Sequence, residues 1–283
     1  MIEAYFHGSM GNNIIQNIGL SIIAEKLNLK IKNYKINKDI NKFKINLWKD
    51  GRELPSSKNL NIYKDSDYEL LLSKSFNPKN KITILGNFQI GDFLINNQLK
   101  IKSMFNYKKE YKFKKNQILV FVRLGDVAHL APPFEYYAKA INVITASLKM
   151  EISSDSYIAT DAPTHPLIKK LVKRFNLKVF KGDRVETILF VSRFKNIILT
   201  GGSFNWLGAF LSEAENIIYP EPTYLWHGDM FSCFPWTEIK WRNYAPLKFY
   251  VLKNHYRIYN FFWVKTLNLK NFYRKIKKII KVF

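Results

Sequence analysis

The sequence predicts an α/β fold in which a parallel sheet carries helices on both faces. Short apolar segments alternate with segments of helical period between residues 117 and 220, and residues 1–30 contain a further strand, loop and helix. The chain has 283 residues, of which 47% are hydrophobic, so it can bury a full core. We therefore expect a globular protein with one large domain or two of ordinary size.

The N-terminal part begins with a predicted strand at residues 2–6, "IEAYF", and continues with the glycine-bearing turn "HGSMGNN" and a helix over residues 14–29. A further strand is expected in "KITILGNF", residues 81–88. The intervening residues, from about 30 to 80, are polar and irregular and give only weak predictions. The lysine-rich stretch at 106–116 is typical of a linker, so we expect an N-terminal domain over residues 1–114.

After this linker, predicted strands and helices alternate regularly. Strands separated by helices of about 10 to 15 residues pair in parallel, and such doubly wound sheets bind ligands beyond the carboxyl ends of their strands. We expect a second domain over residues 115–235 and a basic, aromatic, helical tail over residues 236–283. The expected strands are residues 117–122, 156–160, 177–180, 196–200 and 216–220, and the expected helices are residues 133–149, 165–175, 185–194 and 204–214.

The chain is strongly basic, with 45 Lys and Arg residues against 22 Asp and Glu residues and a net charge of +23. This charge favours acidic partners such as nucleic acid, anionic lipid or a phosphorylated small molecule, although lysines on a solvated surface give the same total. Residues 239–283 contain twelve basic residues and no acidic one.

No leader segment is expected, because the first residues have no basic region followed by an apolar run. No membrane-spanning segment is expected either, because no apolar stretch is long enough, so we expect a cytoplasmic protein. The one cysteine, Cys233, excludes an internal disulfide, and no Cys/His group has zinc-like spacing. Asp65 and Asp67 have an Asp-x-Asp spacing that can hold a metal, but helix capping is favoured there. No metal is expected.

Arg123 is the first candidate site residue, because it falls where the strand at 117–122 ends. Its side chain is expected to reach the crevice at the carboxyl edge of the sheet, where a guanidinium can hold a phosphate through paired hydrogen bonds. Gly125 allows the backbone to turn, and Asp126 can orient the arginine or a ligand hydroxyl. The alternative is a salt bridge between Arg123 and Asp126 that ties the loop.

Two further loops combine glycines with a helix entry. The turn with Gly8, Gly11 and Asn12 suits an anion or a sugar-phosphate at a helix N-terminus; the alternative is a helix entry capped by Asn12 or Ser9. In the loop after residues 196–200, the backbone amides of Gly201 and Gly202 and the hydroxyl of Ser203 can bind phosphate oxygens, and the rings of Phe204 and Trp206 can contact a nucleobase or a sugar. The alternative is that both rings pack in the core and that Ser203 caps the helix. The residues of this second loop are Gly201, Gly202, Ser203, Phe204 and Trp206.

Thr160 and Asp161 follow the strand at 156–160, and Asp161 can accept hydrogen bonds from a nucleotide. The alternative is a helix entry in which Asp161 or Thr164 is the cap.

Taken in order, these motifs resemble those of the bacterial alpha-1,2-fucosyltransferases. The family's Gly-Gly-Leu-Gly-Asn-Gln loop, its His-x-Arg-Arg-Gly-Asp-Tyr motif and its Ser-Ser-Phe-Ser-Trp-Trp-Gly-Ala motif are echoed by "GSMGNNIIQ", "FVRLGDV" and "GGSFNWLGAFL". The chain departs from the pattern at Phe121, Leu124, Gly202 and Leu207, and Leu124 stands in place of the second arginine. The retained residues are Gly8, Gly11, Asn12, Gln16, Arg123, Gly125, Asp126, Ser203, Phe204, Trp206, Gly208 and Ala209.

The resemblance implies two Rossmann-like domains in a GT-B-like arrangement, with the donor bound by the C-terminal domain and the acceptor on the side of the N-terminal one. It also implies an inverting transfer of fucose from GDP-fucose to a galactoside-type acceptor in a cell-surface glycan or lipid-linked oligosaccharide. Arg123 would hold the diphosphate, and Asp126, His129 and Asp161 are candidates for the base. Because Leu124 replaces an arginine, another nucleotide sugar stays open as the donor.

The tail at 267–283 places apolar residues on one helical face and lysines on the other. Such a helix binds an anionic membrane surface, which would make the protein peripheral, or it packs on its own domain. The alternative from another class is a nucleic-acid-binding protein, favoured by the charge and by aromatics among lysines. Without a helix-turn-helix, RNA-recognition or zinc-finger pattern, no nucleic-acid partner is expected.

Overall fold

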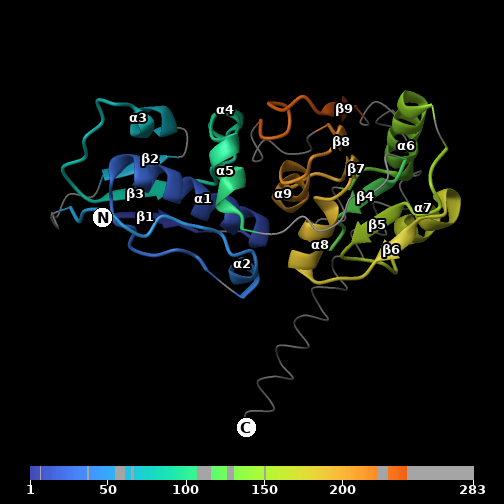
Figure 1. Ribbon diagram of the computed structural model, residues 1–283, viewed down its shortest axis with the longest axis horizontal. Helices are drawn as coiled ribbons and strands as arrows, with labels where there is room; N and C mark the ends of the chain where they lie inside the picture. The colour runs from blue at the N-terminus through green and yellow to red at the C-terminus, as the bar shows by residue number, and fades with distance from the viewer. Residues whose placement is uncertain are drawn as a thin grey trace, which may run out of the picture. The chain divides into compact units, whose positions relative to one another are not determined.

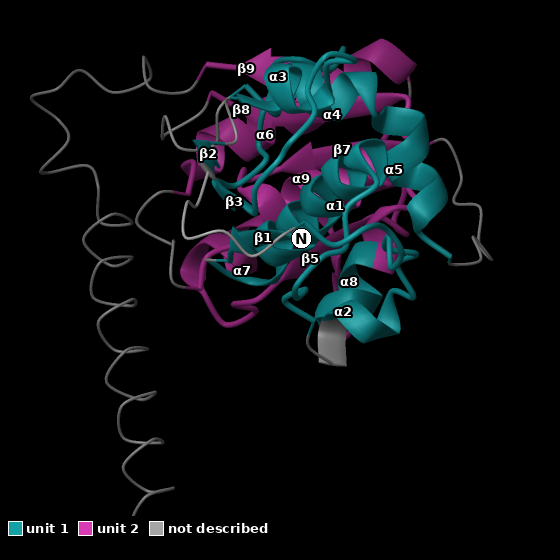
Figure 2. Cartoon of the chain, turned by 90° about the vertical axis from the view of Figure 1, so that its left-hand side faces the viewer, with its two compact units in different colours: residues 1–110, 183–188, 224–235 teal, residues 111–182, 189–223, 236–283 magenta. Residues whose placement is uncertain are grey.

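The computed structural model describes residues 1–6, 8–36, 38–54, 61–64, 67–106, 116–125, 131–149, 151–221 and 229–240 (Figure 1). Contacts within the chain divide it into two compact units (Figure 2). Unit 1 comprises Met1–Glu110, Asp183–Ile188 and Tyr224–Pro235, and unit 2 comprises Tyr111–Gly182, Leu189–Thr223 and Trp236–Phe283. The domains expected from the sequence were continuous, whereas two short segments from the C-terminal half group with unit 1.

Unit 1 contains a parallel sheet of the strands β1 (Ile2–Tyr5), β2 (Asn61–Lys64) and β3 (Ile82–Leu85), in the order β1-β3-β2. The helix α1 (Met10–Leu27) packs against β1 and buries most of its residues. Ile14, Ile18 and Ile22 are among its apolar side chains and are almost fully buried, as the helical period of the sequence predicts.

The helix α1 begins four residues earlier than the sequence predicts, at Met10. Gly11 and Asn12 therefore lie in the first helical turn and not in the loop. The other helices of unit 1 are α2 (Lys38–Lys42), α3 (Tyr68–Leu72), α4 (Gly91–Asn96) and α5 (Gln98–Met104). The region that gave weak predictions thus contains α2, β2 and α3, which are all short.

Unit 2 contains six parallel strands in the order β6-β5-β4-β7-β8-β9. From the central strand the chain first builds outward to one side, and then crosses over and builds outward to the other side. This is the strand order of the Rossmann fold, so the predicted doubly wound parallel sheet is confirmed. The strands are β4 (Ile118–Val122), β5 (Tyr157–Thr160), β6 (Lys178–Phe180), β7 (Asn196–Leu199), β8 (Asn216–Pro220) and β9 (Thr237–Ile239), and the last of these was not expected.

Helices lie on both faces of this sheet. The helices α6 (Phe134–Leu148) and α7 (Pro166–Phe175) share one core cluster with Val120, Ile158 and Ile198 of the strands. On the other face, Gly208 of α9 (Ser203–Phe210) lies against Phe121, and Phe190 near the end of α8 (Arg184–Val191) packs on Tyr157. The central strand β4 is buried at every position, as expected for a strand covered on both sides.

Among the described residues, no helix is both long and apolar enough to cross a membrane. The tail at 267–283, for which membrane binding was one prediction, lies outside the described residues.

Candidate functional site

The strand order of unit 2 reverses between β4 and β7, which are neighbours in the sheet. Ligands of doubly wound sheets bind at such a switch point, beyond the carboxyl ends of the two strands. The segment 123–125 follows β4, and the segment 200–202 follows β7. The sequence-predicted candidates Arg123, Gly125, Gly201 and Gly202 therefore lie at the part of the sheet where a ligand is expected.

The backbone of Arg123 is held by a buried hydrogen-bond network centred on Thr200. The Arg123 N–H donates to Thr200 Oγ1 at 3.2 Å, and Thr200 Oγ1 donates to the Phe121 carbonyl at 3.0 Å. Tyr137 lies with its hydroxyl 3.1 Å from the same oxygen. Because the threonine has only one proton to donate, Tyr137 is the donor in that contact. The network fixes the point at which the chain leaves β4.

The two tyrosines of α6 are both fully buried beneath this turn. Burial raises the pKa of Tyr136 well above its ordinary value, and it likewise raises the pKa of Tyr137. Both hydroxyls therefore stay protonated, and Tyr136 donates to the Leu199 carbonyl at 2.8 Å. Neither Thr200 nor the tyrosine hydroxyls were among the predicted site residues; the Tyr-Tyr pair at the start of a helix was the available signal.

Leu124 stands where the fucosyltransferase motif has its second arginine, and its side chain is fully buried in the core cluster with Tyr136 and Tyr137. Position 124 thus faces the interior of unit 2. Arg123, which is only partly buried, is the cationic side chain of the described segment 123–125.

The carboxylate of Asp161 is hydrogen-bonded to the backbone of the turn after β4. Its Oδ1 accepts hydrogen bonds from the N–H groups of Leu124 at 2.8 Å and Gly125 at 3.2 Å, and its Oδ2 accepts from Gly125 at 3.1 Å. A Cβ atom on Gly125 would lie 2.7 Å from this Oδ2, so the close approach requires glycine. Asp161 therefore positions the turn that carries Arg123.

Thr160 also serves the local backbone, since its Oγ1 accepts from Ala162 N–H at 3.1 Å. The expected caps of the next helix differ from the observed one. His165, fully buried, caps α7 by accepting from Leu167 N–H through Nδ1 at 3.2 Å, and neither Asp161 nor Thr164 is the cap. His165 is followed by Pro166, a residue favoured at the first helical position.

The turn before α9 has the backbone geometry of an anion site. Gly201 and Gly202 adopt φ values of 112° and 86°, in the region that side-chain-bearing residues avoid. Gly202 is the N-cap of α9, so Ser203 is the first helical residue and not the cap. A Cβ atom on Gly202 would meet nothing within 4 Å, so the space beside the helix N-terminus is open. Helix N-termini of this kind bind phosphate groups.

Of the side chains at the start of α9, Phe204 is partly exposed, whereas Asn205 and Trp206 are buried. Phe204 is partly exposed and packs edge-on against Phe121, with ring centroids 5.5 Å apart. Trp206 is 1% exposed and stacks on Phe210, so it fills the core and presents no face to a ligand. Asn205 is fully buried; its Nδ2 donates to the Phe121 carbonyl at 2.6 Å, and its Oδ1 accepts nothing from the described residues.

The candidates of unit 1 lie around the start of α1. Gly8 has a φ of 81°, and Ser9 is the N-cap but makes no side-chain cap bond. Gly11 is buried in the first turn, and Asn12 accepts a hydrogen bond through Oδ1 from Gln89 Nε2 at 3.1 Å. Asn12 therefore joins the turns after β1 and β3 and does not cap α1.

Three predicted residues lie outside the described residues, namely Asp65, Asp126 and His129. Asp67 is the N-cap residue of α3, and its Oδ2 accepts from Lys64 N–H at 2.8 Å. No group of His, Cys, Asp and Glu side chains that could hold a metal occurs among the described residues.

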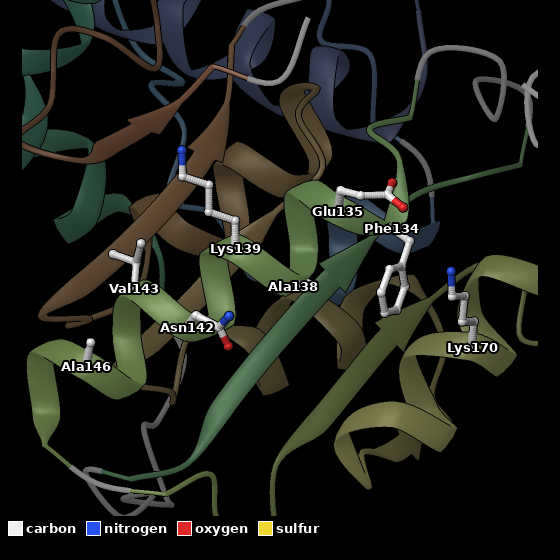
Figure 3. A pocket seen from close by; sticks show the side chains of 8 residues that line it. All are labelled: Phe134, Glu135, Ala138, Lys139, Asn142, Val143, Ala146 and Lys170. Carbon is white, nitrogen blue, oxygen red and sulfur yellow. The ribbon is translucent and has the colours of Figure 1, made fainter. Parts of the chain in front are cut away.

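A separate groove of about 550 Å³ runs along the outer face of α6 (Figure 3). Phe134 and Val143 contribute apolar surface, and Lys170 of α7 places its Nζ 4.0 Å from the centre of the Phe134 ring. None of the sequence-predicted site residues lines this groove.

Comparison with known proteins gives no assignment, since no protein-family model and no curated protein matches the chain. The resemblance to bacterial alpha-1,2-fucosyltransferases stays a prediction from the motif residues.

Proposed function

We propose that the protein is a glycosyltransferase that binds the diphosphate of a nucleotide sugar at the switch point of unit 2. The observation that carries this proposal is the position of Arg123. Arg123 directly follows β4, and its N–H donates to Thr200 Oγ1 at 3.2 Å. Thr200 is directly followed by the Gly201–Gly202 turn before α9. A cationic fork and a glycine-lined helix N-terminus thus flank the same edge of the sheet.

This arrangement suits a leaving diphosphate for physical reasons. A guanidinium binds phosphate oxygens through two parallel hydrogen bonds, and N–H groups at a helix N-terminus add donors with a favourable dipole. Thr200, Tyr137 and Asp161 fix the backbone on both sides of Arg123 before any ligand arrives. Such preorganised donors stabilise the charge that develops on the leaving group without further rearrangement.

The proposed reaction is an inverting transfer. The acceptor hydroxyl oxygen forms a bond to C1 of the sugar as the bond from C1 to the diphosphate oxygen breaks, and the hydroxyl proton passes to a base. Of the three predicted bases, Asp161 is engaged by backbone N–H groups, so its proposed role is to position Arg123. Asp126 and His129 are the other two predicted bases.

In its most specific form, the proposal is an alpha-1,2-fucosyltransferase that uses GDP-fucose and a galactoside-type acceptor on a glycan or lipid-linked oligosaccharide. The support is the ordered resemblance of three motifs, which retain Arg123, Gly125 and Ser203 among others. A peripheral position on a membrane, through the tail at 267–283, would suit a lipid-linked acceptor.

A second candidate is the same reaction with another nucleotide sugar. It is favoured by Leu124, because this side chain is buried where the family has its second arginine. A motif with one guanidinium offers fewer hydrogen-bond donors to the diphosphate than a motif with two. Such a site can select a nucleotide sugar with a different sugar or nucleobase.

Calorimetric binding of GDP-fucose, GDP-mannose, UDP-galactose and GDP tests the proposal. Arg123→Ala is expected to weaken the preferred nucleotide by about 10- to 100-fold, because a charge-assisted contact is lost, and Arg123→Lys is expected to recover only part of it. The exposed Arg174 in the last turn of α7 is the matched control, and Arg174→Ala should bind as the wild type does.

Preference for GDP-fucose would support the specific form, and preference for another nucleotide sugar would support the second candidate. If no nucleotide binds, or if Arg123→Ala binds equally well, the proposal fails. The nucleic-acid alternative gives a different pattern, namely binding to unrelated oligonucleotides that weakens steeply with salt and does not respond to Arg123→Ala.

A further inference from the structure

The carboxyl edge of the unit 1 sheet carries an uncharged polar cluster that the proposed donor site does not use. The turn after β1 and the segment 86–90 after β3 meet there, because β1 and β3 are parallel neighbours. Neither residues 8–16 nor residues 86–90 include a charged side chain. The cluster, which we name the carboxamide edge, consists of Asn12, Asn13, Gln16 and Gln89.

Three of these four side chains hold the edge together. Gln16 is fully buried and donates through Nε2 to the Gly86 carbonyl at 2.9 Å. Gln89 donates through Nε2 to Asn12 Oδ1 at 3.1 Å. Both bonds join the segment after β3 to α1, so these carboxamides serve the fold.

Asn13 is different. Its side chain is 7% exposed, and its Nδ2 donates to the Gly8 carbonyl at 3.4 Å, which places the carboxamide against the turn before α1. Its Oδ1 is buried and accepts no hydrogen bond from any residue that the structure describes. Burying an acceptor without a partner is unfavourable, so this oxygen indicates a donor that the described residues do not supply, and a bound ligand can provide it.

The same turn also offers donors. The helix α1 has 18 residues, and the N–H groups of its first turn have no partner within the helix. Its N-cap, Ser9, makes no side-chain cap bond to them. A ligand at the carboxamide edge thus meets N–H donors and one buried carbonyl acceptor.

This pairing selects a hydroxyl group over an anion. A hydroxyl accepts from an N–H and donates to a carbonyl at the same time, whereas an unprotonated phosphate oxygen only accepts and is repelled by Asn13 Oδ1. Two carboxylates add to this preference. Asp229 Oδ1 accepts from Gly91 N–H at 2.6 Å, directly after the segment 86–90, and Asp92 follows it in α4. Negative charge at this end of the segment disfavours a second anion.

We propose that the carboxamide edge binds a neutral, hydroxyl-rich ligand such as a sugar ring, with one hydroxyl donating to Asn13 Oδ1 and accepting from the first turn of α1. This differs from the expectation that the turn at Gly8 binds an anion or a sugar-phosphate. As the acceptor subsite of a glycosyltransferase, the assignment rests on the proposed function; as a hydroxyl site, it stands without it.

Amide chemical shifts of the full chain, labelled with ¹⁵N, test the location of the site. Methyl β-galactoside, methyl α-glucoside and inorganic phosphate are titrated separately at millimolar concentration. At least one sugar is expected to shift the amides of Gly8 and Gly11, and phosphate is expected to leave them unchanged. If phosphate shifts them, or if neither sugar does, the proposal is overturned.

Asn13→Leu tests the proposed contact, because leucine has a similar volume and no acceptor. Sugar affinity is expected to fall about tenfold, while the Tm of the ligand-free protein stays the same or rises, since a buried oxygen without a partner is removed. In the matched control Gln16→Leu, Tm is expected to fall because a bond that joins α1 to the segment after β3 is lost. If Asn13→Leu fails to fold, Asn13→Ala provides the same test.

Wild-type sugar affinity in the folded Asn13 variant would refute the contact. GDP binding measured on the same samples separates the two proposals, because it is expected to be unaffected by Asn13→Leu. Failure of wild-type GDP binding would contradict the donor site and leave the sugar result intact.

Discussion

The two units share one backbone arrangement at the carboxyl edge of a sheet but surround it with different side chains. In each, a strand of a parallel sheet ends, a glycine with positive φ follows, and a helix begins with its N-terminus at the carboxyl edge. Gly8 before α1 has a φ of 81°, and Gly202 before α9 has a φ of 86°. Unit 2 surrounds this geometry with Arg123 and Asp161, whereas unit 1 surrounds it with uncharged carboxamides.

The likeness extends to one asparagine in each helix. Asn13 and Asn205 both donate through Nδ2 to a backbone carbonyl near the strand end, and both bury an Oδ1 that accepts nothing from the described residues. Because the backbone donors are alike, the proposed difference in ligand depends on the neighbouring charge. A guanidinium favours a diphosphate, and an edge without cations favours a neutral ligand.

Replacing each glycine by alanine gives the largest expected difference between the two edges. A Cβ atom on Gly8 would lie 2.2 Å from Asn12 Nδ2, whereas a Cβ on Gly202 would meet nothing within 4 Å. Gly202→Ala is expected to lose about 1 kcal/mol of unfolding free energy from backbone strain alone, and Gly8→Ala about 3 kcal/mol because steric overlap is added. Urea unfolding measures both values.

The ligand effects should separate in the same variants. The methyl group of Gly202→Ala fills open space beside α9 and is expected to weaken nucleotide binding, while Gly8→Ala is expected to weaken sugar binding. Equal losses of stability in the two variants would show that the carboxamide of Asn12 moves away without cost.

Asp161→Ala tests how far the charged edge depends on its positioning residue. Removing the carboxylate leaves the N–H groups of Leu124 and Gly125 without their acceptors, and the expected loss of unfolding free energy is about 1 to 2 kcal/mol because Asp161 is exposed to solvent. Nucleotide affinity is expected to fall as the turn that carries Arg123 loosens.

Asp161→Asn is the control, because it keeps one acceptor oxygen for Leu124 N–H. It should retain most of the stability and of the nucleotide affinity. A complete loss of turnover in Asp161→Asn, with nucleotide binding intact, would instead make Asp161 the base.

Tyr137→Phe probes the other side of the same turn with a smaller effect. It removes the hydroxyl that donates to Thr200 Oγ1 at 3.1 Å and leaves the buried ring in place. The expected cost is about 1 kcal/mol of unfolding free energy with a modest loss of nucleotide affinity. A variant with unchanged stability would show that a water molecule replaces the hydroxyl.

The sequence predicts the elements of unit 2 better than those of unit 1 for a physical reason. The central strands of unit 2, β4 and β7, are buried at every position, so β4 is an uninterrupted apolar run, and the helix α7 of this unit has a clear period. In unit 1, α2, β2 and α3 are short, with 5, 4 and 5 residues, so they carry little periodic signal. The final strand β9 has only 3 residues, and two of them are exposed.

The site was predictable to the extent that chain position determines it. Arg123 and Gly202 follow strands, and their place at the carboxyl edge follows from the parallel order. Thr200 and the cap His165 were missed because their roles depend on side-chain contacts across the fold. The hydrogen bonds that Asp161 accepts were not predicted for the same reason, since their donors lie 36 and 37 residues away in the sequence.

The smallest expected effect concerns the one acidic side chain of β1, Glu3, which is 15% exposed and pairs with Lys81 at 2.8 Å and Lys32 at 2.9 Å. Burial alone would raise its pKa, but the hydrogen bonds from Lys81, Lys32 and Thr83 together lower it below the ordinary value of 4.5. A pKa lowered in the folded state contributes stability that is fully present above pH 4.5 and is lost as the pH falls through the folded-state pKa.

Glu3→Gln is therefore expected to reduce the dependence of the unfolding free energy on pH in the acid range. At neutral pH the unfolding free energy should change by less than about 1 kcal/mol, because both lysines are partly exposed. The exposed pair of Glu53 with Lys30 is the control, and Glu53→Gln should change the curve less. Sugar affinity at the carboxamide edge should not follow the titration of Glu3 while the protein is folded, because residues 8–16 and 86–90 themselves carry no titrating side chain. A sugar affinity that follows the titration of Glu3 would mean that the edge is not electrostatically neutral, and the contrast between the two units would fail.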